Sequence, residues 1–192
     1  NAGRSIRRTI YDAADRLHDY DRVMKINYFG AINLTIPLVD RMRISGTGGH
    51  VINISTMGTQ LKGTPRFGAY IASKNALDGF AESVSAETYN DGINWTTVHL
   101  PLTQTDMIAP AQNTWNAYPK LSVEAGADMI LYAVAYEPIR VWHPGILVIG
   151  LIDRLFTKSA LKYKSLEFPK YEPEKPLPKV AIIGAGMSGI AM

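Results

Sequence analysis

The sequence contains no cysteine among its 192 residues. Disulfide bonds and thiolate-ligated metal sites are therefore excluded for this chain, and a cytoplasmic location is the one we expect. The sequence also lacks any run of about 18 apolar residues, the length that a membrane-spanning helix needs, so we expect no such helix. The four histidines show no metal-ligand spacing and are interpreted as structural or exposed: His18, His50, His99 and His143.

An excess of charge of either sign is also missing. The formal net charge is +3, charged residues make up 19 % and apolar residues 46 %, which is an ordinary balance for a globular domain. The basic residues are scattered and no motif resembles a nucleic-acid-binding one, so no nucleic-acid partner is expected. Arg4, Arg7 and Arg8 form one small basic cluster. Two interpretations stay open for it, a solvated loop or a contact with a phosphate group.

The most informative stretch of the sequence runs from Tyr70 to Lys74. A Tyr and a Lys four residues apart in a helical pattern lie on one face, about one turn apart. A free phenol is mostly protonated at neutral pH, and an ammonium group close to it lowers its pKa. Such a tyrosine could act as an acid or base near pH 7. Taken alone, the pair also fits an ordinary helix surface, so the surrounding motifs decide between the two interpretations.

Polar residues occur at ordered positions on both sides of this pair. A short apolar, β-branched stretch at 50–54 predicts a buried strand, and two hydroxyl residues follow it. A second predicted strand, at 94–100, is followed by a proline. In chain order the motif residues are Asn1-Ala2-Gly3, Asn27, Ser55-Thr56, Tyr70, Lys74 and Pro101-Leu102.

The order and spacing of these motifs resemble the short-chain dehydrogenase/reductase family over residues 1–110. Within that family the chain looks most similar to the bacterial acyl reductase-like branch, on the strength of residues 1–8 and of Pro101-Leu102 followed by 107–110. The resemblance implies an oxidoreductase that uses NAD or NADP and transfers a hydride between this cofactor and a carbonyl or alcohol.

The same resemblance implies roles for individual residues. Tyr70 would be the acid/base at the substrate oxygen, while Lys74 would lower its pKa and bind the nicotinamide ribose. Asn27 would hold a water that links Lys74 to solvent. A hydroxyl at the strand end would bond the substrate carbonyl, and the family's serine aligns best with Thr56, although Ser55 is adjacent. Which of the two hydroxyls acts stays open.

Further residues would hold the cofactor by the same resemblance. The first three would close a strand end beside it and the last three would contact its nicotinamide side: Asn1, Ala2, Gly3, Pro101, Thr103 and Thr105. Leu102 stands where the family has glycine, and leucine tolerates positive φ poorly, so we expect less backbone freedom there. The family's glycine-rich turn would precede Asn1, so we expect this chain to be part of a longer protein whose cofactor half is missing here.

Alternating strand and helix patterns predict an α/β fold with a doubly wound, Rossmann-like parallel sheet that is incomplete at its N-terminal side. We assign residues 1–163 to this domain. Pro37 is expected to kink or shorten the first helix. The predicted helices cover 20–43, 69–90, 122–136 and 146–163, and the predicted strands cover 50–54, 94–100 and 139–142.

Two segments bear on substrate and partners. Residues 106–121 correspond to the family's substrate lid, and their apolar content favours a fatty acyl or other lipid-like substrate, although they could equally just cap the core. The helix at 146–163 would pack on the domain or a dimer partner, or rest on a membrane surface with its basic face outward. A homo-oligomer is expected, because the family's counterpart of helix 20–43 packs at a dimer interface.

The C-terminal tail predicts the start of a second domain. Residues 164–178 are rich in proline and form a linker, and residues 179–192 are a strand followed by Gly184, Gly186 and Gly189. This dinucleotide-binding fingerprint resembles the FAD-binding start of flavin-containing and Baeyer–Villiger-type monooxygenases, so FAD is the expected cofactor there. Two alternative hypotheses are a catalytically inactive fragment and a non-catalytic scaffold or oligomerisation domain beside a flavin monooxygenase.

Overall fold

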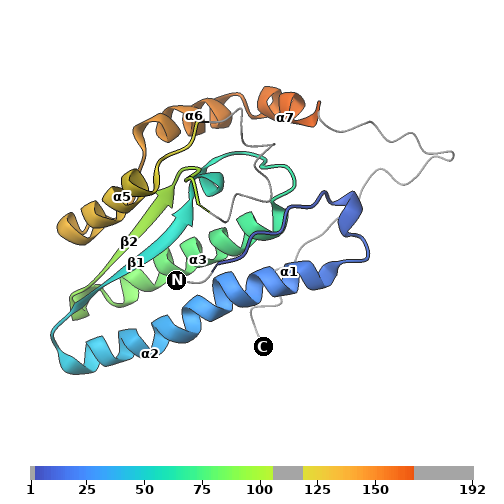
Figure 1. Ribbon diagram of the computed structural model, residues 1–192. Coiled ribbons are helices and arrows are strands. Elements are labelled where there is room, and N and C mark those ends of the chain that lie inside the picture. The colour runs from blue at the N-terminus through green and yellow to red at the C-terminus, as the bar shows by residue number, and fades with distance from the viewer. Residues whose placement is uncertain (1–2, 106–118, 167–192) are drawn as a thin grey trace.

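The chain forms three layers around a parallel β-sheet (Figure 1). The computed structural model describes residues 3–105 and 119–166. The strands β1 (Gly49–Thr56), β2 (Ile93–Leu100) and β3 (Arg140–Trp142) lie in the order β1-β2-β3, and both pairs are parallel. Helix α3 (Gly68–Glu87) covers one face and helix α5 (Val123–Tyr136) covers the other. The predicted α/β fold with a parallel sheet is confirmed.

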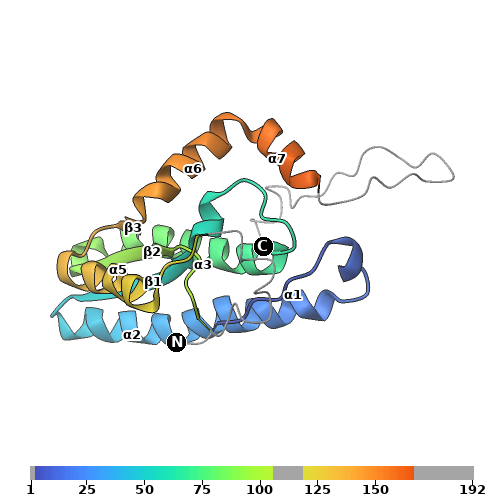
Figure 2. The ribbon, with the colours of Figure 1, turned by 45° about the horizontal axis from the view of Figure 1, so that its top comes forward.

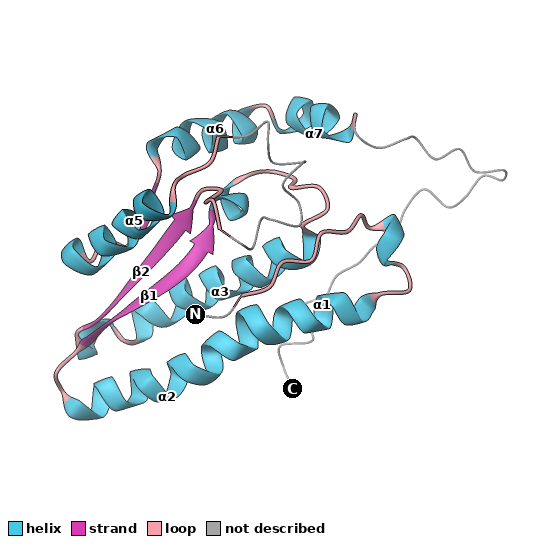
Figure 3. Ribbon diagram, viewed as in Figure 1, coloured by secondary structure: helices cyan, strands magenta, loops and turns pink. Residues whose placement is uncertain are grey.

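The first helical segment is longer than expected and changes its geometry midway (Figure 3). Helix α1 (Leu17–Met24) leads into a π-helical turn at Lys25–Phe29, and α2 (Gly30–Ser45) follows directly. Pro37 lies inside α2 without ending it, so the prediction that it would shorten the helix is wrong. A single missing N–H removes only one helical hydrogen bond, and the turns on both sides remain intact. The helix ends at Gly46, whose φ of 66° is left-handed.

Short turns connect the remaining elements. A 3₁₀ turn (Tyr11–Ala13) precedes α1, a second one (Met57–Gln60) follows β1, and a third (Tyr89–Asp91) follows α3. Helix α5 starts where predicted, because the Ser122 hydroxyl accepts a hydrogen bond from the Ala125 N–H at 3.1 Å.

The helix predicted at 146–163 is two helices. These are α6 (Pro144–Leu155) and α7 (Thr157–Ser165), which meet in a bend at Phe156 (Figure 2). The backbone of Phe156, with φ of −115°, leaves the helical region there. Helix α7 extends to Ser165, so the predicted linker can begin only after it; the rest of that linker and the predicted second domain lie outside the described residues.

The two faces of the sheet differ in chemistry. On the α5 side, Val98 of β2 packs with Ala133 of α5 and Val141 of β3, and partly buried Ile52 and Ile54 of β1 lie against this cluster. Because side chains alternate along a strand, the neighbours of these residues project toward α3. Those neighbours are polar near the carboxyl ends of the strands and are buried: Asn53, Ser55, Thr97 and His99.

An ion-pair cluster joins the N-terminal segment to α1. Asp19, 3 % exposed, accepts from the guanidinium groups of Arg8 at 3.1 Å and Arg16 at 3.0 Å. The Arg8 N–H also donates to the Arg66 carbonyl at 2.8 Å. Hydrogen bonds and charge from Arg16, and then from Arg8, hold the pKa of Asp19 below its ordinary value. Arg8 thus pairs with a residue of the same chain. This agrees with the interpretation of its segment as a structural loop rather than a phosphate contact.

Asp19→Asn should destabilise the fold in a pH-dependent way. Because the pKa of Asp19 is lowered by folding, its contribution to stability is present above the unfolded value near 3.9 and is lost as the pH falls through the folded one. Urea unfolding of wild type and variant should therefore differ most at neutral pH and converge toward about pH 3. A difference that stays constant over this range would contradict the assigned ion pairs.

Two glycines before β1 give a matched test of backbone packing. Both have positive φ, 66° at Gly46 and 69° at Gly48, so alanine strains either one by about 1 kcal/mol. A Cβ at Gly46 meets nothing within 4 Å, whereas one at Gly48 would lie 2.6 Å from the Gly92 carbonyl oxygen. Gly48→Ala should therefore lower the urea midpoint clearly more than Gly46→Ala. Equal losses would mean that β1 does not approach the turn before β2 this closely.

Candidate active site

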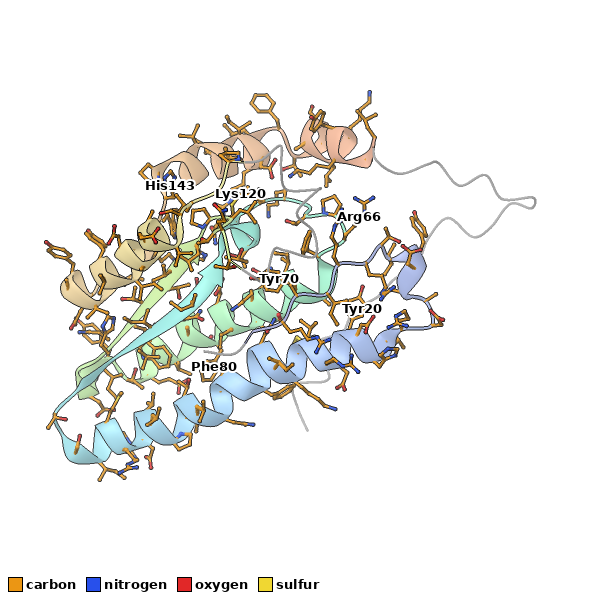
Figure 4. All side chains as sticks on the ribbon, in the orientation of Figure 1. Tyr20, Arg66, Tyr70, Phe80, Lys120 and His143 are labelled. Carbon is orange, nitrogen blue, oxygen red and sulfur yellow. The ribbon has the colours of Figure 1, made fainter. Side chains whose placement is uncertain are left out.

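Tyr70, Lys74 and Thr56 meet at the carboxyl end of β1. Tyr70 and Lys74 lie one turn apart on α3, and Figure 4 shows Tyr70 beside the end of the sheet. The Thr56 hydroxyl lies close enough to the Tyr70 phenol to lower the pKa of that phenol. The Lys74 Nζ donates to the Ile54 carbonyl oxygen at 2.8 Å. The three side chains are half-buried, so a ligand at this edge of the sheet could still reach them.

The two neighbouring hydroxyls at the end of β1 have different surroundings. Ser55 is 4 % exposed and donates to the Asp78 carboxylate at 2.8 Å, beneath α3. The Thr56 hydroxyl accepts from the Gly58 N–H at 3.4 Å and lies beside the Tyr70 phenol. Thr56 is therefore the hydroxyl that shares the site with Tyr70, and Ser55 is bonded away from it.

Burial dominates the titration of both groups on α3. Desolvation raises the pKa of Tyr70, the Thr56 hydroxyl opposes this rise, and the negative charge of Asp78 adds to it. Desolvation also lowers the pKa of Lys74, against the charge of Asp78. The predicted lowering of the Tyr70 pKa by Lys74 stays a prediction. In this arrangement the ammonium donates to the Ile54 carbonyl, and burial of the phenol is the largest influence on its pKa.

Asn27 lies in the π-helical turn and is buried. Its Nδ2 donates to the Arg4 carbonyl at 2.8 Å and to the Ser73 Oγ at 2.9 Å, and its Oδ1 accepts from the Arg4 N–H at 2.8 Å. The Ser73 hydroxyl in turn donates to the Tyr70 carbonyl at 2.7 Å. Both amide hydrogens of Asn27 thus go to protein atoms. The predicted water that would link this residue to Lys74 stays a prediction.

The loop after β2 lies beside the end of β1, since Thr56 is paired with Leu100. The Thr103 hydroxyl donates to the Pro101 carbonyl at 3.1 Å, and Thr103 bridges Leu121. Leu102 does not adopt positive φ, so its replacement of glycine introduces no strain of that kind. Thr105 is exposed at the end of this described stretch.

Several predicted site residues lie outside the described part of the chain. These are Asn1, Ala2, the lid residues 106–118, and Gly184, Gly186 and Gly189. Gly3 is described and exposed. The predicted roles of all of them stay predictions.

Sequence reasoning missed Asp78, which stands next to the predicted site. It follows Lys74 by four residues, as Lys74 follows Tyr70, so one face of α3 presents three titratable groups in a row. This spacing could have identified Asp78 as a candidate site residue from the sequence. His99 was interpreted as structural or exposed, and it is buried at 2 % exposure, close to Asp78.

The site has free hydrogen-bonding capacity that fits a nicotinamide cofactor. An ammonium has three hydrogens, and within the described residues the Lys74 Nζ gives one hydrogen bond, to Ile54. It could therefore donate to ribose hydroxyls, as the resemblance implies. The described residues contain no cluster of three or more His, Cys, Asp or Glu side chains placed to hold a metal ion. None of the described helices is long and apolar enough to cross a bilayer.

Comparison with known proteins agrees with this geometry. Residues 1–116 match the short chain dehydrogenase family. A fatty acyl-CoA reductase of Acinetobacter baylyi is 45 % identical over 141 residues, which is 73 % of this chain and 47 % of that protein. A fatty acyl-CoA reductase of Mycobacterium tuberculosis is 33 % identical over 155 residues, covering 81 % of this chain and 52 % of that protein. The chain thus spans about half the length of these curated relatives.

Solved structures show the same fold. A short chain dehydrogenase from Burkholderia cenocepacia in complex with NADP superposes with a TM-score of 0.70 at 22 % identity, over 86 % of this chain and 66 % of that one. A short-chain dehydrogenase from Streptomyces avermitilis gives a TM-score of 0.65 at 24 % identity, over 87 % and 67 %. With a family match over residues 1–116, this chain belongs to the short chain dehydrogenase family.

Proposed function

We propose that the protein reduces the carbonyl group of a fatty acyl or similar hydrophobic substrate, with NAD(P)H as the hydride donor and Tyr70 as the proton donor. The observation that supports this most directly is the cluster of Tyr70, Thr56 and Lys74 at the carboxyl end of β1. In open α/β sheets, ligands bind at this end of the strands. The bound nicotinamide would supply the hydride. Tyr70 would supply the proton, Thr56 would orient the carbonyl and Lys74 would hold the cofactor.

The half-buried position of Tyr70 is compatible with the role of a proton donor. A carbonyl that gains a hydride must also gain a proton, so the acid has to be protonated at working pH. Burial raises the pKa of Tyr70 above its ordinary value of 10.0, which keeps the phenol protonated. Thr56, with its hydroxyl against Tyr70, would donate a hydrogen bond to the same carbonyl oxygen and orient it. Lys74 would hold the ribose of the cofactor through its remaining hydrogens.

The substrate class comes from the relatives and from the predicted lid. Two relatives of 45 % and 33 % identity are named fatty acyl-CoA reductases. The lid sequence contains apolar residues such as Met107, Ile108 and Trp115, in agreement with a long-chain substrate. Both observations support a substrate with a hydrophobic acyl chain next to its carbonyl group rather than a sugar.

The predicted partners and the second domain also remain part of this proposal. Exposed Leu34, Ile36 and Leu38 on α2 support a homo-oligomer, and exposed Val148 and Ile149 on α6 leave room for a protein or membrane contact there. The strand and glycine pattern at 179–192 supports a following FAD-binding domain, joined by a linker in 164–178. Sequencing the gene beyond this chain tests the fusion, because a long flavin domain should follow.

Tyr70→Phe in the full-length protein should remove the proton donor and leave the ring in place. We expect kcat for fatty acyl-CoA or fatty aldehyde reduction to fall by about 10³-fold. NADPH binding, followed by fluorescence titration, should change little. Turnover equal to wild type would overturn the assignment of Tyr70.

The pH dependence checks the same group in wild type. Reduction needs the protonated phenol, whose pKa is raised, so the rate should hold through neutral pH and fall only above the ordinary tyrosine value of 10.0. A loss of rate between about pH 7 and pH 9 would contradict this, because an unperturbed phenol already stays protonated there.

Thr56→Val tests which hydroxyl acts. We expect it to lower kcat by about 10²-fold, since one hydrogen bond to the developing oxyanion is lost. Thr56→Ser keeps the hydroxyl and should retain activity. Ser55→Ala removes the hydroxyl that donates to Asp78 and should cost clearly less than Thr56→Val. A larger loss for Ser55→Ala would reverse the assignment.

A further inference from the structure

Beneath the site, a buried polar network joins α3 to the ends of β1 and β2. Asp78 of α3, 8 % exposed, accepts from Ser55 Oγ at 2.8 Å and from Asn53 Nδ2 at 2.9 Å. Its Oδ2 lies 4.0 Å from Nδ1 of His99, which belongs to β2 and is paired with Ser55 in the sheet. Three adjacent elements thus meet at one carboxylate.

His99 continues this network into the turn that follows Thr56. Its Nδ1 lies 3.1 Å from the Thr59 Oγ1, and Thr59 donates its hydroxyl hydrogen to the Thr56 carbonyl at 2.9 Å. Gln60 Nε2 lies within 3.2 Å of the same Thr59 oxygen. The same Gln60 Nε2 lies 3.4 Å from the His99 Nδ1. Nδ1 of His99 is thus the ring atom that contacts this turn, at both Thr59 and Gln60.

The imidazole is held in this orientation from its other sides. It packs edge-on against Trp142 of β3, with ring centroids 5.8 Å apart. Only 2 % of His99 is exposed, so a change of rotamer would need its neighbours to move. The turn that contains Thr59 thus contacts an imidazole of fixed orientation.

We propose that His99 and Asp78 are positioning residues: together they hold the strand end and turn that carry Thr56, so that its hydroxyl faces Tyr70 and the substrate oxygen. This inference rests on the proposed function. It adds that neither residue touches the substrate; His99 acts through Thr59 and the Thr56 backbone, and Asp78 acts through Ser55. A displacement of about 1 Å in a reacting group can cost about 10²-fold in rate, so such a support should be visible in kcat.

The burial and the charges around the network influence the protonation of His99, Tyr70 and Lys74. Burial lowers the pKa of His99, against the charge of Asp78, a hydrogen bond to the Thr56 backbone and the charge of Glu82, while Arg140 of β3 lowers it further. The imidazole is therefore neutral at pH 7. On α3, the negative charge of Asp78 raises the pKa of both Tyr70 and Lys74.

Asparagine and glutamine at position 99 distinguish positioning from mere packing. The terminal amide of asparagine can take the place of Nδ1, whereas that of glutamine reaches toward the place of Nε2. In the full-length protein, His99→Asn should keep kcat within a few-fold of wild type, and His99→Gln should lower it by about 10²-fold. KM and cofactor affinity should stay close to wild type in both.

We expect His99→Asn and His99→Gln to have similar stability, because both place an amide in the same buried site. A difference in kcat between them then reports on positioning. Thermal midpoints should be measured together with kcat and KM. Similar midpoints with a selective loss of kcat in His99→Gln support the proposal. Equal kcat in the two variants overturns it, since the contact at the place of Nδ1 would then not matter.

Asp78→Asn tests the second residue through pH. The introduced amide oxygen can still accept from Asn53, and its NH₂ can donate to Ser55, so the contacts are retained while the charge is lost. Because that charge raises the pKa of Tyr70, its removal should move the alkaline fall in reduction rate to lower pH. A large loss of kcat at neutral pH in Asp78→Asn, although these contacts are retained, would overturn the positioning role of Asp78.

Tyr70→Phe, measured in parallel, separates this proposal from the one on which it rests. Loss of turnover in Tyr70→Phe together with equal activity of His99→Asn and His99→Gln would overturn only the positioning role. Full activity of Tyr70→Phe would overturn the proposed function itself.

Discussion

The in-register parallel pairing of β1 and β2 is the constraint on which the site depends. It places Ser55 opposite His99 and Thr56 opposite Leu100 at one edge of the sheet. Because side chains alternate, a slip of one residue would send Ile54 toward α3 and Ser55 into the apolar cluster around Val98. Asp78 would then lose the hydroxyl at 2.8 Å and remain buried without it. The register that builds the core is therefore the same one that builds the candidate active site.

The two faces of the sheet differ in how they are stabilised: one packs apolar side chains and the other holds buried polar contacts. On the α5 side, apolar side chains around Val98 and Ala133 exclude water. On the α3 side, buried polar groups cost free energy unless they are bonded, and the network around Asp78 provides most of those bonds. Such a network specifies one arrangement more than it adds net stability, although within the described residues the buried Oδ1 of Asn53 has no hydrogen-bond partner. Burial is also the largest influence on the pKa of Tyr70, above this network.

Periodicity alone predicted the parallel sheet, the alternation in β2 and the position of Tyr70 on a helix, because these follow from local spacing. The bend at Phe156 and the π-helical turn around Asn27 could not be predicted in this way, since neither has a local breaker such as proline. Spacing placed Lys74 near Tyr70 but could not show that its ammonium donates to Ile54, 20 residues away. The contact between Asp78 and His99 likewise depends on how strands and helix meet in space.

Helix α3 is held from two opposite sides, and this explains how a half-buried tyrosine can have a defined position. From the sheet side, Asp78 accepts from Ser55 and Asn53. From the helix layer, Asn27 donates to Ser73, whose hydroxyl donates to the Tyr70 carbonyl at 2.7 Å. Each such hydrogen bond adds only about 1 kcal/mol of net stability. Their larger effect is to fix the backbone of Tyr70 relative to the end of β1, so that a substrate oxygen meets donors that need no rearrangement.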